Sequence, residues 1–214
     1  MDKKIVLTVA RQFGSGGHDV AKKVSELLDI PFYDREIIGL AAKKSGLSEN
    51  LFDGLDEKPT TSLLYSLVMG VQSGTGAYWR YGDMTGADNV FRIQSQIIRS
   101  IAEKDSCVIV GRCADYILRE HPRCMSVFIT ANDADRVARL RLSKKMDGFK
   151  NLSDNELVEY MRKEDKKRAE YYNFYTYKNW GHSTSYDLCL NSSVLGTDKC
   201  VEIIADHIKN VLLK

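Results

Sequence analysis

The stretch of sequence that decides the fold is residues 5–19, IVLTVARQFGSGGHD. Residues 5–10 form a short β-branched apolar run, which predicts a strand, and a glycine-rich segment follows directly. Residues 19–28 then repeat apolar side chains at helical spacing. Glycines let several backbone N–H groups point at one anion, and a helix N-terminus adds positive partial charge. The order of strand, loop and helix therefore predicts a phosphate-binding loop.

The alternation of strand and helix continues along the chain. Short apolar runs predict further strands at residues 30–33, 107–110, 125–129 and 187–190. Helical periodicity predicts helices at residues 35–44, 89–104, 114–120, 133–146, 153–172 and 198–212. Continuous apolar strands that alternate with helices are typical of a parallel sheet covered on both faces. We therefore expect a three-layer α/β/α fold with about five parallel strands.

Composition excludes several classes of protein. The chain has 214 residues, with 31 Lys and Arg against 29 Asp and Glu, so its formal net charge is +2. This balance argues against a nucleic acid polymer bound through bulk charge. No apolar run approaches the roughly 18 residues that span a bilayer, and no signal-peptide pattern is present. The chain has five cysteines, none of them in a CxxC pair, and three lie in apolar runs: Cys107, Cys124 and Cys189. This pattern indicates reduced thiols in the core rather than disulfides or a zinc site. We expect a cytoplasmic protein that binds no membrane.

The loop departs from the common phosphate-binding pattern GxxxxGK[ST]. When Gly16 is aligned with the glycine before the motif lysine, Gly17 takes the lysine position and Arg11 the first glycine position. Two interpretations stay open. Either another cation replaces the lysine (Arg11, Lys22, Lys23 or an arginine from elsewhere), or the loop binds phosphate with little catalysis.

Asp19 stands where related motifs carry threonine, which makes it a candidate ligand of Mg²⁺. For Asp19, capping of the following helix is favoured over binding of Mg²⁺. If the loop has no function, it is a plain strand-to-helix turn with Asp19 as its N-cap. The candidate loop residues are Arg11, Gly14, Ser15, Gly16, Gly17, His18 and Asp19.

Four segments together resemble one family. They are RQFGSGG at residues 11–17, IPFYDRE at 30–36, VIVGRCADYIL at 108–118 and YDLCLNSSVLG at 186–196. With these segments the chain resembles the cytidylate kinase-like family, a branch of the P-loop nucleoside monophosphate kinases. The resemblance implies a P-loop NTPase-like fold, ATP and Mg²⁺ as cofactors, and a small acceptor such as CMP.

The resemblance also implies acceptor-binding residues. Asp34, followed by Arg35, matches the aspartate of the family motif LDTGAxYR, whose glycines and final arginine are absent here. Arg112 matches the arginine of the family GRD step, with Cys113 in place of the aspartate. Both Asp34 and Arg112 follow expected strands, whose carboxyl ends face the ligand crevice of such sheets. The alternatives without function are that Asp34 is a solvated helix cap and that Arg112 is an ordinary surface arginine.

Kinases of this type close a lid that brings arginines onto the phosphates, and Arg139 and Arg168 are the residues that match here. A solvated, mixed-charge helix face is the alternative. We expect a lid region at about residues 147–182 and a mobile insert at about residues 54–88, where six of the 15 glycines fall among aromatic side chains. The core of the single domain 1–214 would then comprise 1–53, 89–146 and 183–214.

The sequence therefore predicts a nucleotide kinase-like phosphotransferase. Arg112, Arg139 and Arg168 would be its catalytic cations, and its partners would be a nucleotide and a small-molecule acceptor. A catalytically weak, regulatory nucleotide-binding protein is the alternative, because the loop lysine is absent. An interaction protein that uses the 54–88 insert is a third hypothesis. The aromatic cluster of residues 171–180 could pack the lid, stack a base or form a homodimer contact.

Overall fold

The computed structural model describes residues 4–34, 86–143 and 151–212. Within them, five strands form one all-parallel sheet in the order β2-β3-β1-β4-β5. The sheet confirms the predicted α/β fold with five parallel strands. The strands are β1 (Val6–Arg11), β2 (Phe32–Tyr33), β3 (Cys107–Val110), β4 (Cys124–Thr130) and β5 (Leu188–Asn191).

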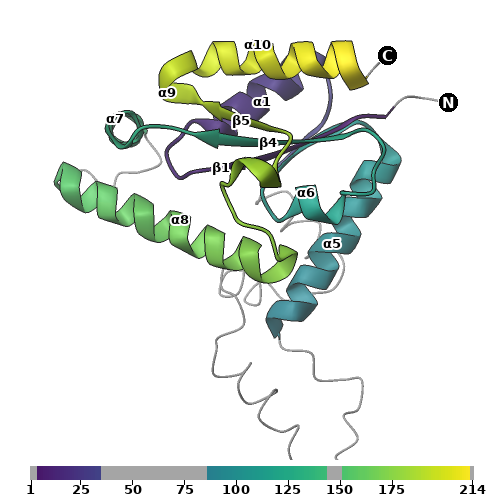
Figure 1. Cartoon of the computed structure of the whole chain (residues 1–214), viewed down its shortest axis with the longest axis horizontal. Helices are drawn as coiled ribbons and strands as arrows, with labels where there is room; N and C mark the ends of the chain where they lie inside the picture. The colour runs from purple at the N-terminus through teal and green to yellow at the C-terminus, as the bar shows by residue number, and fades with distance from the viewer. Residues whose placement is uncertain (1–3, 35–85, 144–150, 213–214) are drawn as a thin grey trace, which may run out of the picture.

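Helices cover both faces of the sheet (Figure 1). The helices α1 (Gly17–Leu28) and α10 (Thr197–His207) lie on one face, and α5 (Gly86–Lys104) and α6 (Ala114–Ile117) lie on the other. The helices α7 (Asp133–Leu142) and α8 (Asp154–Thr176) extend beyond the end of the sheet at which β1 stops, and the short helix α9 (Ser192–Leu195) follows β5.

Alternate side chains of β1 build the two apolar cores. Leu7 and Val9 pack with the buried side of α1 in one cluster, whereas Val6 packs with Ile98 of α5 in the other. Val24 of α1, at the heart of the first cluster, is completely buried. A continuous apolar strand is therefore buried on both faces, as expected for the centre of a parallel sheet.

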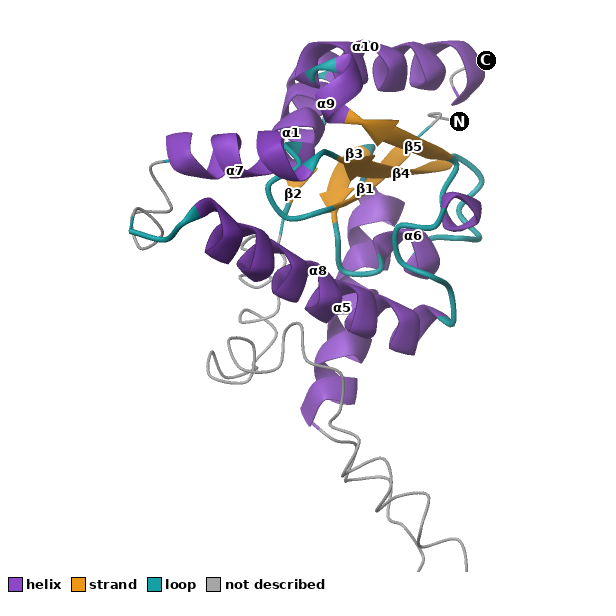
Figure 2. Ribbon diagram, turned by 60° about the vertical axis from the view of Figure 1, so that its left-hand side comes forward, coloured by secondary structure: helices purple, strands orange, loops and turns teal. Residues whose placement is uncertain are grey.

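The strand β1 lies between β3 and β4, so the chain crosses over β1 when it passes from one half of the sheet to the other. In open parallel sheets, ligands bind outside the carboxyl ends of the strands at such a point. The glycine loop and the turn after β3 both lie at this end of the sheet, as Figure 2 shows for the teal loops between strands and helices. The topology therefore brings two candidate ligand-binding segments together.

Several boundaries differ from the predicted ones. Gly16, with φ of 78°, occupies the N-cap of α1 and the helix has no side-chain cap, so the expectation that Asp19 caps it was wrong. The helix α6 ends at Ile117 rather than at 120, and α8 extends past 172 to Thr176. Cys189 is exposed, which corrects its placement in the core.

Some expectations fall on residues that the structure does not describe. They are the helix at 35–44, residues 54–85 of the insert, residues 144–146 of the helix predicted at 133–146, and the start of the lid region at 147–150. Residues 86–88, which were expected in the insert, form the start of α5. Among the described residues, no helix is both long enough and apolar enough to cross a membrane.

Candidate active site

The glycine loop lines a cleft of about 240 Å³ at the N-terminus of α1. Gly14 and Gly16 adopt φ values of 73° and 78°, which favour glycine. The cleft brings together every predicted loop residue and two of the predicted arginines. Its lining comprises Arg11, Gln12, Phe13, Gly14, Ser15, Gly16, Gly17, His18, Asp19, Arg139, Leu140, Ser143 and Arg168.

Buried hydrogen bonds hold the loop in shape. The carbonyl oxygen of Ser15 accepts a hydrogen bond of 2.7 Å from the Ser192 hydroxyl, and both residues are buried. Oε1 of Gln12 accepts hydrogen bonds from the Thr130 hydroxyl and from the Ala131 backbone N–H. Thr130 is the last residue of β4, Ala131 follows it, and Ser192 follows β5, so the loop is held by residues at the carboxyl ends of these two strands.

A buried ion pair joins α7 and α8 to the loop. Arg136 of α7 is only 2% exposed and forms an ion pair with Asp165 of α8. Its Nε also donates a hydrogen bond of 2.7 Å to the carbonyl oxygen of Phe13. Burial raises the pKa of the Asp165 carboxyl, although the Phe13 N–H and the Arg136 guanidinium both favour its charged form. Sequence reasoning treated both side chains as parts of mixed-charge helices and missed this link.

The two arginines predicted for the lid lie against the loop. Nη1 of Arg139 is 3.5 Å from the Gly14 carbonyl oxygen, and its guanidinium lies beside Gly16. Nη1 of Arg168 donates a hydrogen bond of 3.2 Å to the carbonyl oxygen of Arg11. The guanidinium of Arg168 lies 5.3 Å from the centre of the Phe13 ring. Within the described residues, the buried Nε of Arg168 has no hydrogen-bond partner, so one donor is left for an anion.

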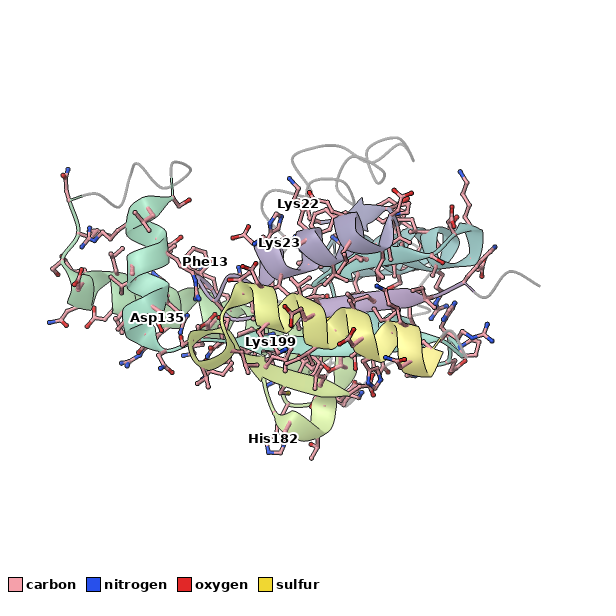
Figure 3. All side chains as sticks on the ribbon, turned by 90° about the horizontal axis from the view of Figure 1, so that it is seen from above. Phe13, Lys22, Lys23, Asp135, His182 and Lys199 are labelled. Atoms are coloured by element: carbon pink, nitrogen blue, oxygen red, sulfur yellow. The ribbon has the colours of Figure 1, made fainter. Side chains whose placement is uncertain are left out.

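The lysines of α1 do not line the loop cleft. Lys22 and Lys23 are both exposed on α1 (Figure 3). Nζ of Lys23 pairs with Asp198 of α10 at 2.6 Å, and Lys22 lies 4.0 Å from Glu26 on its own helix. Among the cations considered as replacements for the loop lysine, only the arginines therefore reach the cleft.

A second, smaller cleft of about 40 Å³ opens at the carboxyl ends of β1 and β3. It shares Arg11 and Arg168 with the loop cleft, so the two arginines lie at the boundary between the clefts. The remaining lining includes the predicted Arg112 and the aromatic side of α8. These residues are Thr8, Val9, Ala10, Gly111, Arg112, Cys113, Asp115, Tyr171, Tyr172 and Trp180.

The turn after β3 has an unusual backbone. Gly111, Arg112 and Cys113 have φ values of 76°, 61° and 53°, so three successive residues are left-handed. For a residue with a side chain, this conformation costs on the order of 1–3 kcal/mol and persists only where the surroundings impose it. Arg112 is 8% exposed. The strained turn thus holds a largely buried guanidinium at the second cleft.

Asp115 supplies a carboxyl group to this second cleft. Its Oδ2 accepts a hydrogen bond of 2.7 Å from the Tyr172 hydroxyl. Burial raises the pKa of the Asp115 carboxyl above its ordinary value, and the Tyr172 hydroxyl partly offsets that shift. The sequence signal was present, since an acid lies two residues beyond the position of the family aspartate, but only the fold could show that it reaches the cleft.

Asp34 does not line the same cleft as Arg112. Its Oδ2 lies 3.3 Å from Nε2 of His18, so it contacts the first turn of α1 instead. Arg35 lies outside the described residues. Asp19 is exposed in the loop cleft, and the described residues hold no group of three or more side chains placed to ligate a metal.

The aromatic cluster at the end of α8 packs that helix onto the core. Tyr175 stacks on Phe91 of α5 with ring centres 4.1 Å apart, and Trp180 meets Phe128 of β4 edge to face at 5.0 Å. The hydroxyl of Tyr171 lies 3.3 Å from Oε1 of the buried Gln94. These contacts favour the packing role among the three that the sequence left open.

Comparisons with solved structures support the fold. An uncharacterized protein from Eubacterium ventriosum is 28% identical, with a TM-score of 0.70 and coverage of 97% of this chain and 99% of that one. Shikimate kinase from Bacteroides thetaiotaomicron is 14% identical, with a TM-score of 0.53 and coverage of 96% and 98%. The second likeness shows a shared fold only. No curated protein matches the chain.

The sequence model of one family matches most of the chain. It covers residues 6–194, which include the glycine loop, the turn after β3, α8 and the strand β5. The matched region therefore contains both clefts and the arginines between them. The chain belongs to the cytidylate kinase-like family.

Proposed function

We propose that the chain is a kinase that transfers the γ-phosphoryl group of ATP to a small acceptor. The observation that carries this proposal is the sharing of Arg11 and Arg168 between the loop cleft and the Arg112 cleft. Phosphoryl transfer depends on positioning and on positive charge around the moving group, since there is little covalent chemistry for the protein to perform. Two adjoining clefts that share arginines at their boundary would meet both needs.

The loop cleft would bind the donor. Its backbone N–H groups and the N-terminus of α1 suit the phosphates of ATP, and Arg139 adds a charge beside Gly16. Asp19 is the carboxylate that faces this cleft, and one or two carboxylates suffice because protein-bound Mg²⁺ usually keeps several waters and substrate phosphates as ligands. Bound Mg²⁺ would neutralise charge on the donor phosphates.

The second cleft would bind the acceptor. The guanidinium of Arg112 matches the fork of a phosphate or carboxylate, which favours an anionic acceptor such as CMP. An acceptor oxygen forms the new bond to phosphorus, and the β–γ bridging oxygen leaves with its electron pair on ADP. If the acceptor is a hydroxyl group, the Asp115 carboxylate would accept the proton that this hydroxyl loses. If the acceptor is a phosphate, its attacking oxygen carries no proton, and no base is needed.

A coupled assay of ADP release tests the proposal. Purified protein with ATP and Mg²⁺ would be offered a panel of nucleoside monophosphates and small phosphorylated or hydroxylated compounds. We expect ADP release that depends on at least one anionic acceptor. Absence of acceptor-dependent release from folded protein that binds ATP would reject the kinase and favour the second candidate below.

The second candidate is a nucleotide-binding regulatory protein without turnover. The observation that favours it is Gly17 at the lysine position of the loop. Calorimetry that detects ATP or CMP binding, together with no transfer in the assay, would support it. For either candidate we propose small-molecule partners rather than a nucleic acid polymer or a membrane. The exposed Tyr177, at the end of α8, is a candidate homodimer contact.

A further inference from the structure

Two glycines from different elements leave room for one arginine side chain. A Cβ on Gly17 would lie 2.5 Å from Cβ of Arg11 and 3.1 Å from Cβ of Ile129. A Cβ on Gly111 would overlap Nη1 of the same Arg11. Gly17 therefore leaves space for the base of the Arg11 side chain, and Gly111 leaves space for its guanidinium.

The obstacle to a side chain at position 17 is steric. The backbone of Gly17 is not left-handed, so its conformation would accept any L residue. Cβ of Arg11, however, is fixed by the backbone of β1 and cannot swing away as the tip of a side chain can. With this backbone, a lysine at position 17 needs a glycine at position 11.

The common loop pattern GxxxxGK has that combination, with glycine at the position of Arg11 and lysine at that of Gly17. In this chain the cation and the glycine have exchanged positions. On the basis of the kinase function proposed above, we infer that Arg11 replaces the loop lysine and binds the terminal phosphate of the donor. The absent lysine is then a relocated cation rather than a lost one.

The location of Arg11 suits this role. It lines both clefts, and its guanidinium lies at Gly111, next to Arg112 of the acceptor cleft. Its own carbonyl oxygen is held by Arg168 at 3.2 Å. A guanidinium at the boundary can form two hydrogen bonds to a phosphoryl group whose equatorial oxygens share the negative charge. Arg11 would thus contact the group as it passes between the clefts.

Four variants test the exchange. Arg11→Met removes the charge and keeps the stem, and Arg11→Gly and Gly17→Lys change one position each. The double variant Arg11→Gly/Gly17→Lys restores the GxxxxGK pattern. The measurements are the melting temperature, the affinity for a non-hydrolysable ATP analogue and for ADP by calorimetry, and turnover with an active acceptor. Lys22→Met, which removes an exposed cation of α1, is the matched control.

Arg11→Met should weaken binding of the ATP analogue more than binding of ADP, and should lower turnover by about 10²–10³-fold, as for loss of one donor to a transition-state anion. Gly17→Lys alone should lower the melting temperature. The double variant should recover both the melting temperature and the affinity for the analogue. Lys22→Met should match the wild type in all three measurements.

Two results would overturn the inference. One is an Arg11→Met variant that binds the ATP analogue as the wild type does. The other is a double variant that melts no higher than Gly17→Lys, since the side chains would then not compete for one space. If the wild type shows no turnover with any acceptor, the kinase proposal fails on its own, and the binding and melting data still decide the role of Arg11.

Discussion

The backbone N–H of Phe13 donates a hydrogen bond of 2.6 Å to Oδ1 of Asp165, although 152 residues separate the two. The second oxygen of this carboxylate pairs with Arg136, whose Nε donates to the carbonyl oxygen of Phe13. One loop residue is thus held through both its backbone groups by side chains from α7 and α8. The shape of the glycine loop and the docking of α8 therefore depend on the same carboxylate.

Asp165→Ala should lower the free energy of unfolding by about 3 kcal/mol, because it leaves the charge of Arg136 buried without its closest partner. Urea unfolding followed by circular dichroism measures this change. Arg162→Ala is the matched control on the same helix, since it removes an exposed ion pair with Asp133 and should cost less than about 1 kcal/mol. Equal effects of the two variants would contradict the structural role of Asp165.

Asp115→Asn should raise stability at neutral pH. Burial raises the pKa of the Asp115 carboxyl, so the native state keeps a proton at pH values where the unfolded chain has released it. The free energy of unfolding of the wild type therefore falls as the pH rises from the ordinary pKa of aspartate through the raised one. Asparagine has no charge to desolvate and can still accept the Tyr172 hydrogen bond, so the variant should be more stable than the wild type at pH values above both pKa values.

Urea titrations between about pH 4 and about pH 8 check this prediction, with the advantage of Asp115→Asn shrinking as the pH falls. Asp135→Asn, which changes an exposed side chain of α7, should leave the slope of stability against pH as in the wild type. The same Asp115→Asn protein should turn over a hydroxyl acceptor more slowly. A constant difference from the wild type at every pH would refute the burial argument.

Arg112→Lys should raise the KM for the acceptor at least about tenfold while the KM for ATP changes little, because lysine keeps the charge but loses the two-pronged contact with an anion. Steady-state assays with each substrate varied in turn measure both constants. Arg119→Lys is the control, since this arginine is exposed and lies over the Tyr116 ring at 4.4 Å, outside both clefts. A larger change in the KM for ATP would place Arg112 on the donor side.

Arg139→Ala should weaken ATP binding by about tenfold, as expected for the loss of a charge-assisted hydrogen bond of about 1.5 kcal/mol. Calorimetry with a non-hydrolysable ATP analogue gives the affinity directly. Arg141 lies two residues further along α7 but pairs with Asp154 at the start of α8, so Arg141→Ala is the control. If both variants bind the analogue equally well, the loop cleft does not hold the phosphates beside Arg139.

Much of the fold was predictable because each element carries its own signal. The four apolar residues 107–110 match β3 residue for residue. The helical spacing of apolar residues predicted α1, and Val20 and Val24 of that pattern are buried. Ser153 and Glu156 form the capping box that starts α8, within one residue of the predicted boundary. The end of α6 was missed because residues 118–120 (Leu118, Arg119 and Glu120) are all good helix formers, although the chain leaves the helix after Ile117.

The site was predictable only where a motif marks it. The glycine loop and Arg112 stand out in the sequence, and the fold brings each of them to the sheet end at which ligands bind. The link between Arg136 and Asp165 and the competition between Arg11 and Gly17 join residues through tertiary contacts, so no local pattern reveals them. Asp34, predicted to bind the acceptor together with Arg112, contacts His18 because β2 ends near the first turn of α1.

The central claim, that the two clefts are the donor and acceptor halves of one kinase site, is tested most directly by a crystal structure with Mg²⁺ and a non-hydrolysable ATP analogue. We predict that the triphosphate lies in the loop cleft beside Gly14, Gly16 and Arg139, with its terminal phosphate at Arg11 and directed toward Arg112. A nucleotide bound elsewhere, or a terminal phosphate that points away from the Arg112 cleft, would contradict the claim.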